Sequence, residues 1–191
     1  MTSTDAAGPA VEQVVLLDED GHPIGVQDKA TVHHGETPLH LAFSCYAFTD
    51  DGSVLVTRRA LHKRTFPGVW TNSFCGHPGP GESFESAVRR RGRFEVGLEA
   101  RAIEVALPDF RYTAEMDGVR ENELCPVYLA RYSGEVSPDP DEVESTRTMS
   151  WAGFVDRALN DPGYSPWARL QVRRLVEADC VTAYLARSAA S

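Results

Sequence analysis

Long hydrophobic runs are absent from this sequence. Its uninterrupted apolar stretches are only a few residues long, whereas a membrane-spanning helix needs roughly 20 apolar residues. We therefore expect no membrane partner. Residues 1–11 are small and polar and lack the basic and apolar regions of a signal peptide. We expect a disordered tail there and a single domain over residues 12–191.

Paired cysteines are also absent. Cys45, Cys75, Cys125 and Cys180 lie far apart and form no CxxC pair, a pattern that fits neither a disulfide framework nor a zinc knuckle. A reducing, cytoplasmic location is therefore the default expectation.

Basic residues are the minority among the charged residues. The chain has 19 Lys and Arg against 28 Asp and Glu, giving a net charge of −9, so we expect no nucleic-acid partner held by bulk charge. Any anionic partner must be bound by a local cationic cluster. With 191 residues, of which 42% are hydrophobic and 25% charged, the chain is typical of a soluble globular protein with a substantial core.

Short apolar segments alternate with turns along the chain. Strands bounded by Gly, Pro or Asp are predicted at residues 14–17, 39–48, 54–57, 70–74, 103–112, 124–131 and 148–154. The turn at residues 49–53 predicts a hairpin between the second and third of them. Helices are predicted from Ser83, as N-cap, to Gly97, as the C′ residue, and over residues 166–186. This order favours an α/β fold, a mixed β-sheet sandwiched between α-helices.

The first predicted helix carries charged residues on its apolar face. That face consists of Phe84, Ala87, Val88 and Leu98. Arg91 and Glu95 fall on the same face, one turn apart, and they form either a buried structural ion pair or a cation and a carboxylate that face into a site. Gly92 costs the helix about 1 kcal/mol relative to Ala, which indicates close packing at this point.

Imidazole and carboxylate side chains suited to Mn, Zn or Fe are present. They are His33, His40, His77, Glu121 and Glu123. If residues 121–123 are extended, Glu121 and Glu123 point to the same face and can share one cation; an exposed acidic loop is the alternative. Cys75 precedes His77 by two residues and is either a reactive thiol at a site or a buried structural cysteine.

A short basic run interrupts the acidic chain. Arg58, Arg59, Lys63 and Arg64 fall within seven positions. They form either a solvated loop or a local anion site, for which phosphate or diphosphate is the natural ligand because Arg binds it through two hydrogen bonds.

Taken together, these segments resemble the type 1 isopentenyl diphosphate isomerases of the Nudix superfamily. The resemblance extends over residues 14–167. It is carried by Leu39-His-Leu-Ala-Phe, Thr57-Arg-Arg-Ala-Leu, Pro67-Gly-Val-Trp-Thr-Asn-Ser-Phe-Cys-Gly-His-Pro, Pro108-Asp-Phe-Arg-Tyr, Glu121-Asn-Glu-Leu-Cys-Pro and Ser165-Pro-Trp. Several long motifs in the right order make chance a poor explanation.

The Nudix hydrolase box, G-x5-E-x7-R-E-U-x-E-E-x-G-U, is only partly kept. Aligned on Gly76, the chain keeps Glu82, Arg90, Glu95, Gly97 and Leu98. It departs from the box at two glutamates, where Arg91 and Phe94 stand, and at the first U position, where Gly92 stands. Hydrolases use those glutamates to hold Mg²⁺ at a pyrophosphate. The resemblance therefore implies a diphosphate site without the full hydrolytic metal cluster.

The resemblance also implies roles for individual residues. A divalent metal, Mn²⁺, Zn²⁺ or Mg²⁺, would be bound by His33, His40, His77, Glu121 and Glu123, and His34 competes with His33 for this role. The diphosphate would be bound by Lys29, Arg59, Lys63 and Arg91. Glu95 would hold a Mg²⁺ that bridges the diphosphate to the protein.

The implied reaction converts isopentenyl diphosphate into dimethylallyl diphosphate through a tertiary carbocation. Cys75 would face Glu123 across the hydrocarbon, with Tyr112 near Glu123 and Trp167 closing the pocket. We expect a monomer that acts on a small molecule without a flavin. The alternatives are a Nudix hydrolase of a diphosphate-containing metabolite and a diphosphate-binding module without catalysis.

Overall fold

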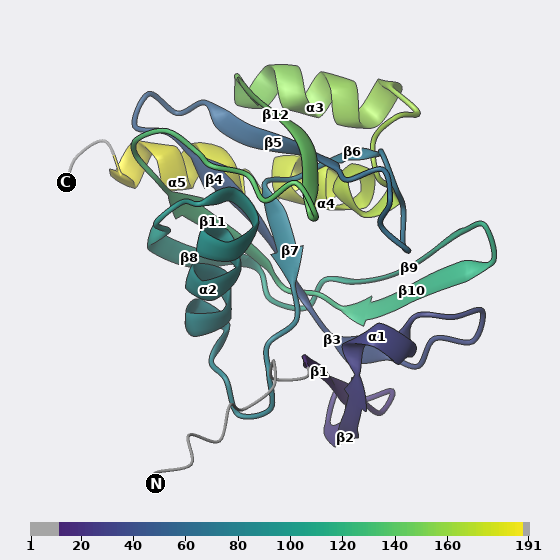
Figure 1. Cartoon of the computed structure of the whole chain (residues 1–191). Helices are drawn as coiled ribbons and strands as arrows, with labels where there is room; N and C mark the ends of the chain where they lie inside the picture. Colours follow the sequence, from purple (N-terminus) through teal and green to yellow (C-terminus); the bar gives the residue numbers. More distant parts are fainter. Residues whose placement is uncertain (1–11, 189–191) are drawn as a thin grey trace, which may run out of the picture.

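The computed structural model describes residues 12–188 (Figure 1). The tail expected at residues 1–11 lies outside the described residues, and the single domain expected over residues 12–191 stays a prediction. Within the described range, none of the helices combines the length and the apolar character that crossing a membrane requires.

The strands form two sheets. The five-stranded sheet has the order β2 (Pro23–Asp28), β1 (Gln13–Leu17), β3 (His40–Leu41), β10 (Val119–Leu124) and β9 (Arg111–Met116). The seven-stranded sheet has the path β12 (Val143–Met149), β5 (Val54–Arg59), β4 (Phe43–Phe48), β11 (Val127–Arg131) and β8 (Arg101–Leu107), with β6 (Trp70–Thr71) beside β5 and β7 (Phe74–Gly76) beside β4. The pairs β10–β3 and β11–β4 are parallel and the others antiparallel, so both sheets are mixed.

Helices cover both faces of the seven-stranded sheet (Figure 1). Helix α2 (Phe84–Val96) lies on one face, and α3 (Trp151–Asn160), α4 (Pro166–Glu177) and α5 (Cys180–Ser188) lie on the other. Successive side chains of β4 point to opposite faces of the sheet. Phe43 and Cys45 therefore belong to the core under α2, whereas Tyr46 and Phe48 belong to the core under α3 to α5. The predicted α/β arrangement of a mixed sheet between helices is confirmed.

Two of the predicted elements are wrong in part. Residues 148–154 were expected to form a strand, but β12 ends at Met149 and α3 begins at Trp151. The reason is the Ser150 N-cap, whose hydroxyl accepts a hydrogen bond from the backbone N–H of Gly153 at 3.2 Å. The helix expected over residues 166–186 is divided into α4 and α5 because Asp179 has a positive φ of 49°.

Several short elements differ from the sequence expectation in their extent. Strand β2, the one-turn helix α1 (Lys29–Val32) and β10 were not predicted as separate elements. The expected strands at residues 39–48, 70–74, 103–112 and 124–131 are each interrupted by one to three residues that belong to no strand. The chain crosses from the five-stranded to the seven-stranded sheet at two of these breaks, between β3 and β4 and between β10 and β11.

Helix α2 follows the sequence prediction closely. The Ser83 hydroxyl accepts from the N–H of Ser86 at 3.2 Å, and Gly97 ends the helix at a φ of 66°. A Cβ at Gly92 would lie 3.1 Å from Leu98 Cδ1 and 3.2 Å from Phe74 Cζ, so the expected close packing is confirmed.

Candidate active site

A cavity of about 640 Å³ opens where strands of both sheets meet α2 and α4. Every residue predicted for the site lines this cavity except His40, which is fully buried behind it. The cavity has two chemically distinct parts. One contains histidines, carboxylates and Cys75, and the other contains basic residues with carboxylates between them.

The histidine part brings together four of the five predicted metal ligands. One ligand atom from each of His33, His40, His77 and Glu123 lies within 4.8 Å of the others. They come from four different segments, since His33 follows α1, His40 lies in β3, His77 follows β7 and Glu123 lies in β10. The fold therefore assembles a group that could hold a metal ion from residues far apart in the sequence.

The charge states of this group suit metal binding. Burial lowers the pKa of His33 to about 3 and that of His77 to about 4, so both imidazoles are neutral ligands near pH 7. Burial raises the pKa of Glu123, but hydrogen bonds from His40 and His77 outweigh it and hold this pKa well below the usual range. Among the described residues, His77 Nδ1 is buried without a hydrogen-bond partner, and His40 Nε2 has only Glu123 Oε1 beside it, at the long distance of 3.5 Å, as expected of atoms that ligate a metal.

The structure distinguishes between the two adjacent histidines. The ring of His33 lies 5.1 Å from that of His40 and 5.7 Å from that of His77, measured between centroids. The side chain of His34 is exposed, and its Nδ1 accepts a hydrogen bond from the N–H of Glu36. His33 is therefore the residue in position to ligate.

Tyr112 joins Glu121 and Glu123. Its hydroxyl lies 2.7 Å from Glu121 Oε2 and 2.9 Å from Glu123 Oε2, both within hydrogen-bond distance. Both glutamates lie in β10 two residues apart, so the expected extended course and common face are confirmed. Burial and the charge of Glu123 raise the pKa of Glu121, and burial raises the pKa of Tyr112 well above its usual value. The phenol is therefore protonated at neutral pH.

Cys75 lines the histidine part of the cavity. Its sulfur is 3.4 Å from Ser44 Oγ and 3.3 Å from both amide atoms of Asn72. Burial raises the pKa of Cys75 to about 12, so its resting form is the thiol. The indole of Trp167 lies nearby, with its ring centroid 5.8 Å from that of Tyr112.

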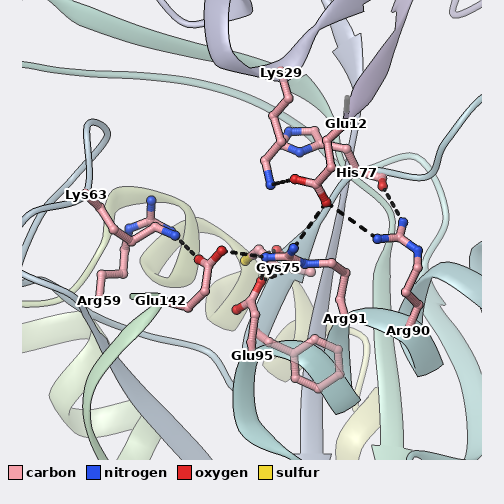
Figure 2. Close-up of polar contacts among 12 residues, drawn as sticks. Glu12, Lys29, Arg59, Lys63, Cys75, His77, Arg90, Arg91, Glu95 and Glu142 are labelled. Atoms are coloured by element: carbon pink, nitrogen blue, oxygen red, sulfur yellow. Dashed lines mark hydrogen bonds and ion pairs between the residues drawn. The ribbon is translucent and has the colours of Figure 1, made fainter. Parts of the chain in front are cut away.

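The basic part of the cavity is occupied by carboxylates (Figure 2). Glu142 contacts both Lys63 and Arg91, the latter at 3.2 Å. Glu12 lies 2.6 Å from Lys29 and 3.4 Å from Arg91. Three of the four predicted diphosphate ligands are thus paired with acidic side chains, so an anionic ligand would have to replace or share these partners.

The sequence left open whether Arg91 and Glu95 form a buried ion pair or face into a site, and the structure shows that they do both. They form a buried ion pair, with Arg91 Nε donating to Glu95 Oε1 at 3.0 Å, and both line the cavity. Gly76 allows this arrangement, because a Cβ there would lie 2.6 Å from Arg91 Cγ. Phe94 is half exposed with Arg91 over its ring at 4.9 Å, so this altered box position does not line the cavity.

The basic run of residues 58–64 is only partly available to an anion. Arg58 and Arg64 hydrogen-bond the carbonyls of Gly68 and Ala30. Arg59 donates to the carbonyl of Thr65 at 2.8 Å and lies 5.7 Å above Trp167. Arg59, Lys63 and Arg64 line the cavity, whereas Arg58 does not.

Sequence reasoning did not single out four residues that contact the predicted ones. They are Glu12, Ser44, Asn72 and Glu142. Asn72 lies inside a quoted motif, three residues before a site-like cysteine, so this position was open to prediction. The other three carry no local signal, since their roles depend on which segments the fold brings to the cavity.

Comparison with known proteins is consistent with this geometry. Residues 38–171 match the model of the NUDIX domain. The chain is 54% identical over 174 residues to an isopentenyl-diphosphate Delta-isomerase of Paenarthrobacter aurescens, covering 90% of this chain and 95% of that protein. It is 55% identical over 173 residues to a protein of the same name from Mycolicibacterium vanbaalenii, covering 90% and 93%.

Solved structures support the fold. The DR0079 protein of Deinococcus radiodurans superposes with a TM-score of 0.64 at 20% identity over 85% of this chain and 98% of that one. A MutT NUDIX hydrolase from Burkholderia pseudomallei gives a TM-score of 0.54 at 23% identity over 72% and 98%. With its NUDIX domain and its high identity to these relatives over most of its length, the chain belongs to the isopentenyl-diphosphate Delta-isomerase family of NUDIX proteins.

Proposed function

We propose that this protein is an isomerase that interconverts isopentenyl diphosphate and dimethylallyl diphosphate in isoprenoid biosynthesis. One observation carries the proposal: a single cavity contains a protonated Tyr112 held by two carboxylates, the Cys75 thiol, and a separate group of basic residues. Moving a double bond requires one proton to be added and another removed. The basic group suits the diphosphate of the same substrate.

The proton transfers are assigned to two parts of the cavity. Glu123 and Tyr112 together deliver a proton to the terminal methylene: the proton leaves the Tyr112 hydroxyl, which is hydrogen-bonded to the ionised Glu123, and the π electrons form the new C–H bond. The resulting tertiary cation loses a proton from the carbon nearer the diphosphate to Cys75, which acts as thiolate after its own proton has passed to solvent. The electron pair of that C–H bond forms the new double bond.

The environment of the cavity supports this assignment. Cys75 and Tyr112 belong to opposite sheets, since β7 is part of the seven-stranded sheet and β9 of the five-stranded one. Because an isolated alkene is a weak base, the acid must be well placed and water excluded. The buried face of Trp167 can stabilise the cation by about 2 kcal/mol.

Two divalent cations complete the proposal. The first, Mn²⁺, Zn²⁺ or Mg²⁺, would be held by His33, His40, His77, Glu121 and Glu123. The second, Mg²⁺, would be held by Glu95, whose Oε1 accepts from Arg91 and whose second carboxylate oxygen is a hard ligand of the type that Mg²⁺ prefers. Bound cations would offset negative charge at Glu95 and Glu123, the two carboxylates that raise the pKa of Cys75.

Diphosphate binding is assigned to Lys29, Arg59, Lys63 and Arg91. The side chains of Arg91 and Lys63 are only 4% and 21% exposed, so their charges act in a poorly solvated region. We place the enzyme in the cytoplasm as a monomer. The free state of all four cysteines in the structure is compatible with that reducing compartment.

The experiment that tests the proposal is incubation of the purified protein with isopentenyl diphosphate and Mg²⁺. We expect dimethylallyl diphosphate to accumulate and no inorganic phosphate or pyrophosphate to be released. Release of phosphate without isomer would favour a Nudix hydrolase. Tight binding without turnover would favour a diphosphate-binding module.

A further inference from the structure

The side chain of Asn72 contacts two residues to which the proposed function assigns chemistry. Asn72 is fully buried between β6 and β7. Its Oδ1 accepts from Trp167 Nε1 at 3.1 Å, and both of its amide atoms lie 3.3 Å from Cys75 Sγ. One amide therefore links the thiol to the indole.

The orientation of this amide is fixed by its other partners. Nδ2 donates to the carbonyl of Phe74 at 2.7 Å and to that of Cys45 at 3.1 Å. Oδ1 also accepts from the hydroxyl of Thr71 at 2.7 Å. Rotating the amide by half a turn would place the NH₂ group against donors and the oxygen against carbonyls, so only one orientation is compatible with these bonds.

A second set of hydrogen bonds reaches Cys75 through Ser44. The Tyr46 hydroxyl donates to Gln171 Oε1 at 2.9 Å, and Gln171 Nε2 donates to Ser44 Oγ at 2.8 Å. Since Ser44 accepts from Gln171, its own hydrogen is available to one of the two sulfurs beside it, Cys75 at 3.4 Å and Cys125 at 3.5 Å. The three polar side chains of this set other than the cysteines are buried.

Each set of hydrogen bonds includes one residue of helix α4. Trp167 and Gln171 are one turn apart on this helix. Asn72 accepts the hydrogen bond from Trp167, and Ser44 accepts the one from Gln171. The sulfur of Cys75 contacts both Asn72 and Ser44. The position of α4 is thus coupled to the position of the thiol.

We propose that Asn72 and Ser44 are positioning residues that hold the Cys75 thiol and the Trp167 indole in fixed relation on the wall of the cavity. The inference rests on the proposed function, which gives Cys75 and Trp167 their roles. Neither Asn72 nor Ser44 lines the cavity, so they act through these two residues and not on the substrate. Substrate binding at the basic end should be left intact.

The test compares Asn72→Ala and Ser44→Ala with Ser73→Ala. Ser73 is a matched control because it is equally buried and bonds only Ala47 N–H and the Leu55 carbonyl among the contacts described. We expect kcat for isopentenyl diphosphate to fall about 100-fold in Asn72→Ala, the cost of misplacing reacting groups. It should fall about tenfold in Ser44→Ala, which removes only one of the two side chains that contact the Cys75 sulfur, while KM changes little in both. Ser73→Ala should keep the native kcat.

A second measurement follows the indole directly. The Nε1–H resonance of Trp167, assigned in NMR spectra with Trp167→Phe, should shift in Asn72→Ala and stay in place in Ser73→Ala. If Asn72→Ala does not fold, Ser44→Ala decides the matter through its kcat. Native kcat in a folded Asn72→Ala or Ser44→Ala protein, or an equal loss in Ser73→Ala, overturns the inference. Failure of the unmodified protein to isomerise the substrate would instead overturn the proposed function.

Discussion

The hydroxyl of Tyr112 shows how single side chains in this cavity acquire their chemical character. It lies between two carboxylates, one with a raised and one with a lowered pKa. Glu123 stays ionised because His40 and His77 hydrogen-bond it, and Glu121 has no such partners. Two chemically identical residues in one strand thus have pKa values shifted in opposite directions through their neighbours alone.

Cys75 and Glu123 are each required for a different half of the proposed reaction. Cys75→Ala and Glu123→Gln should each lower kcat by about 10³-fold or more, and the double variant should cost little beyond either single change, because residues that act as a unit are not additive. Steady-state kinetics with isopentenyl diphosphate measures this. If the loss of kcat in the double variant equalled the product of the two single losses, the two residues would act independently.

Metal binding at the histidine group should release a proton from His40. Burial lowers the pKa of this imidazole, but the hydrogen bond to Glu123 outweighs it and raises the pKa above 6.5. His33 and His77 are already neutral. Calorimetric titration with Mn²⁺ in buffers of different ionisation enthalpy should show release of up to about one proton near neutral pH, with affinity rising as pH rises through the pKa of His40.

The two neighbouring histidines supply the control for that titration. His34→Ala should bind Mn²⁺ as the native protein does, and His33→Ala should lose most of its affinity. Affinity independent of pH, or a loss confined to His34→Ala, would contradict the assignment.

Glu142 should make stability depend on pH in a defined range. Burial raises its pKa, but Lys63 and Arg91 outweigh this and lower it from 4.5 to about 2. A carboxylate with a lowered folded-state pKa stabilises the fold above its unfolded pKa and loses this contribution as pH falls toward the folded value. Glu142→Gln should therefore lower the free energy of unfolding by on the order of 2 kcal/mol at pH 7, and the difference should shrink between pH 4.5 and about 2.

Urea unfolding at several pH values tests this expectation. Glu144→Gln, at an exposed position in β12 two residues after Glu142, should show no such difference. A constant difference between Glu142→Gln and the native protein over the whole range would show that the carboxylate charge is not responsible.

At the scale of elements, α2 was predictable because its signals are local. Ser83, Gly97 and the apolar spacing between them lie within one stretch of sequence. The short elements were not predictable, since β3 and β6 have two residues each and exist through pairing with distant strands. The wrong strand at residues 148–154 arose because β-type residues there follow a serine whose capping role competes with extension.

Gly92 provides a test of how α2 packs. Gly92→Ala should gain up to about 1 kcal/mol of helix propensity but lose about 1–3 kcal/mol through overpacking, because the new methyl group would press on Leu98 and Phe74. We expect a lower Tm in thermal unfolding. An unchanged or raised Tm would show that the contact between α2 and β7 is looser than described.

At the scale of the whole molecule, the cavity exists because two sheets meet. The five-stranded sheet supplies His40, Tyr112, Glu121 and Glu123, and the seven-stranded sheet supplies Cys75 and the strand that leads to His77. Residue types and motifs allowed the participants to be named from the sequence. The pairing of Glu12 and Glu142 with basic residues could not be foreseen, because these carboxylates reach Lys29 and Lys63 only through the fold of distant segments.

The most direct test of the account is turnover in D₂O followed by NMR of the product. Because the proposed mechanism adds a solvent-derived proton to the terminal methylene, the account predicts dimethylallyl diphosphate with deuterium in a methyl group, formed without release of inorganic phosphate. Product without deuterium, or phosphate release in place of isomer, would contradict it.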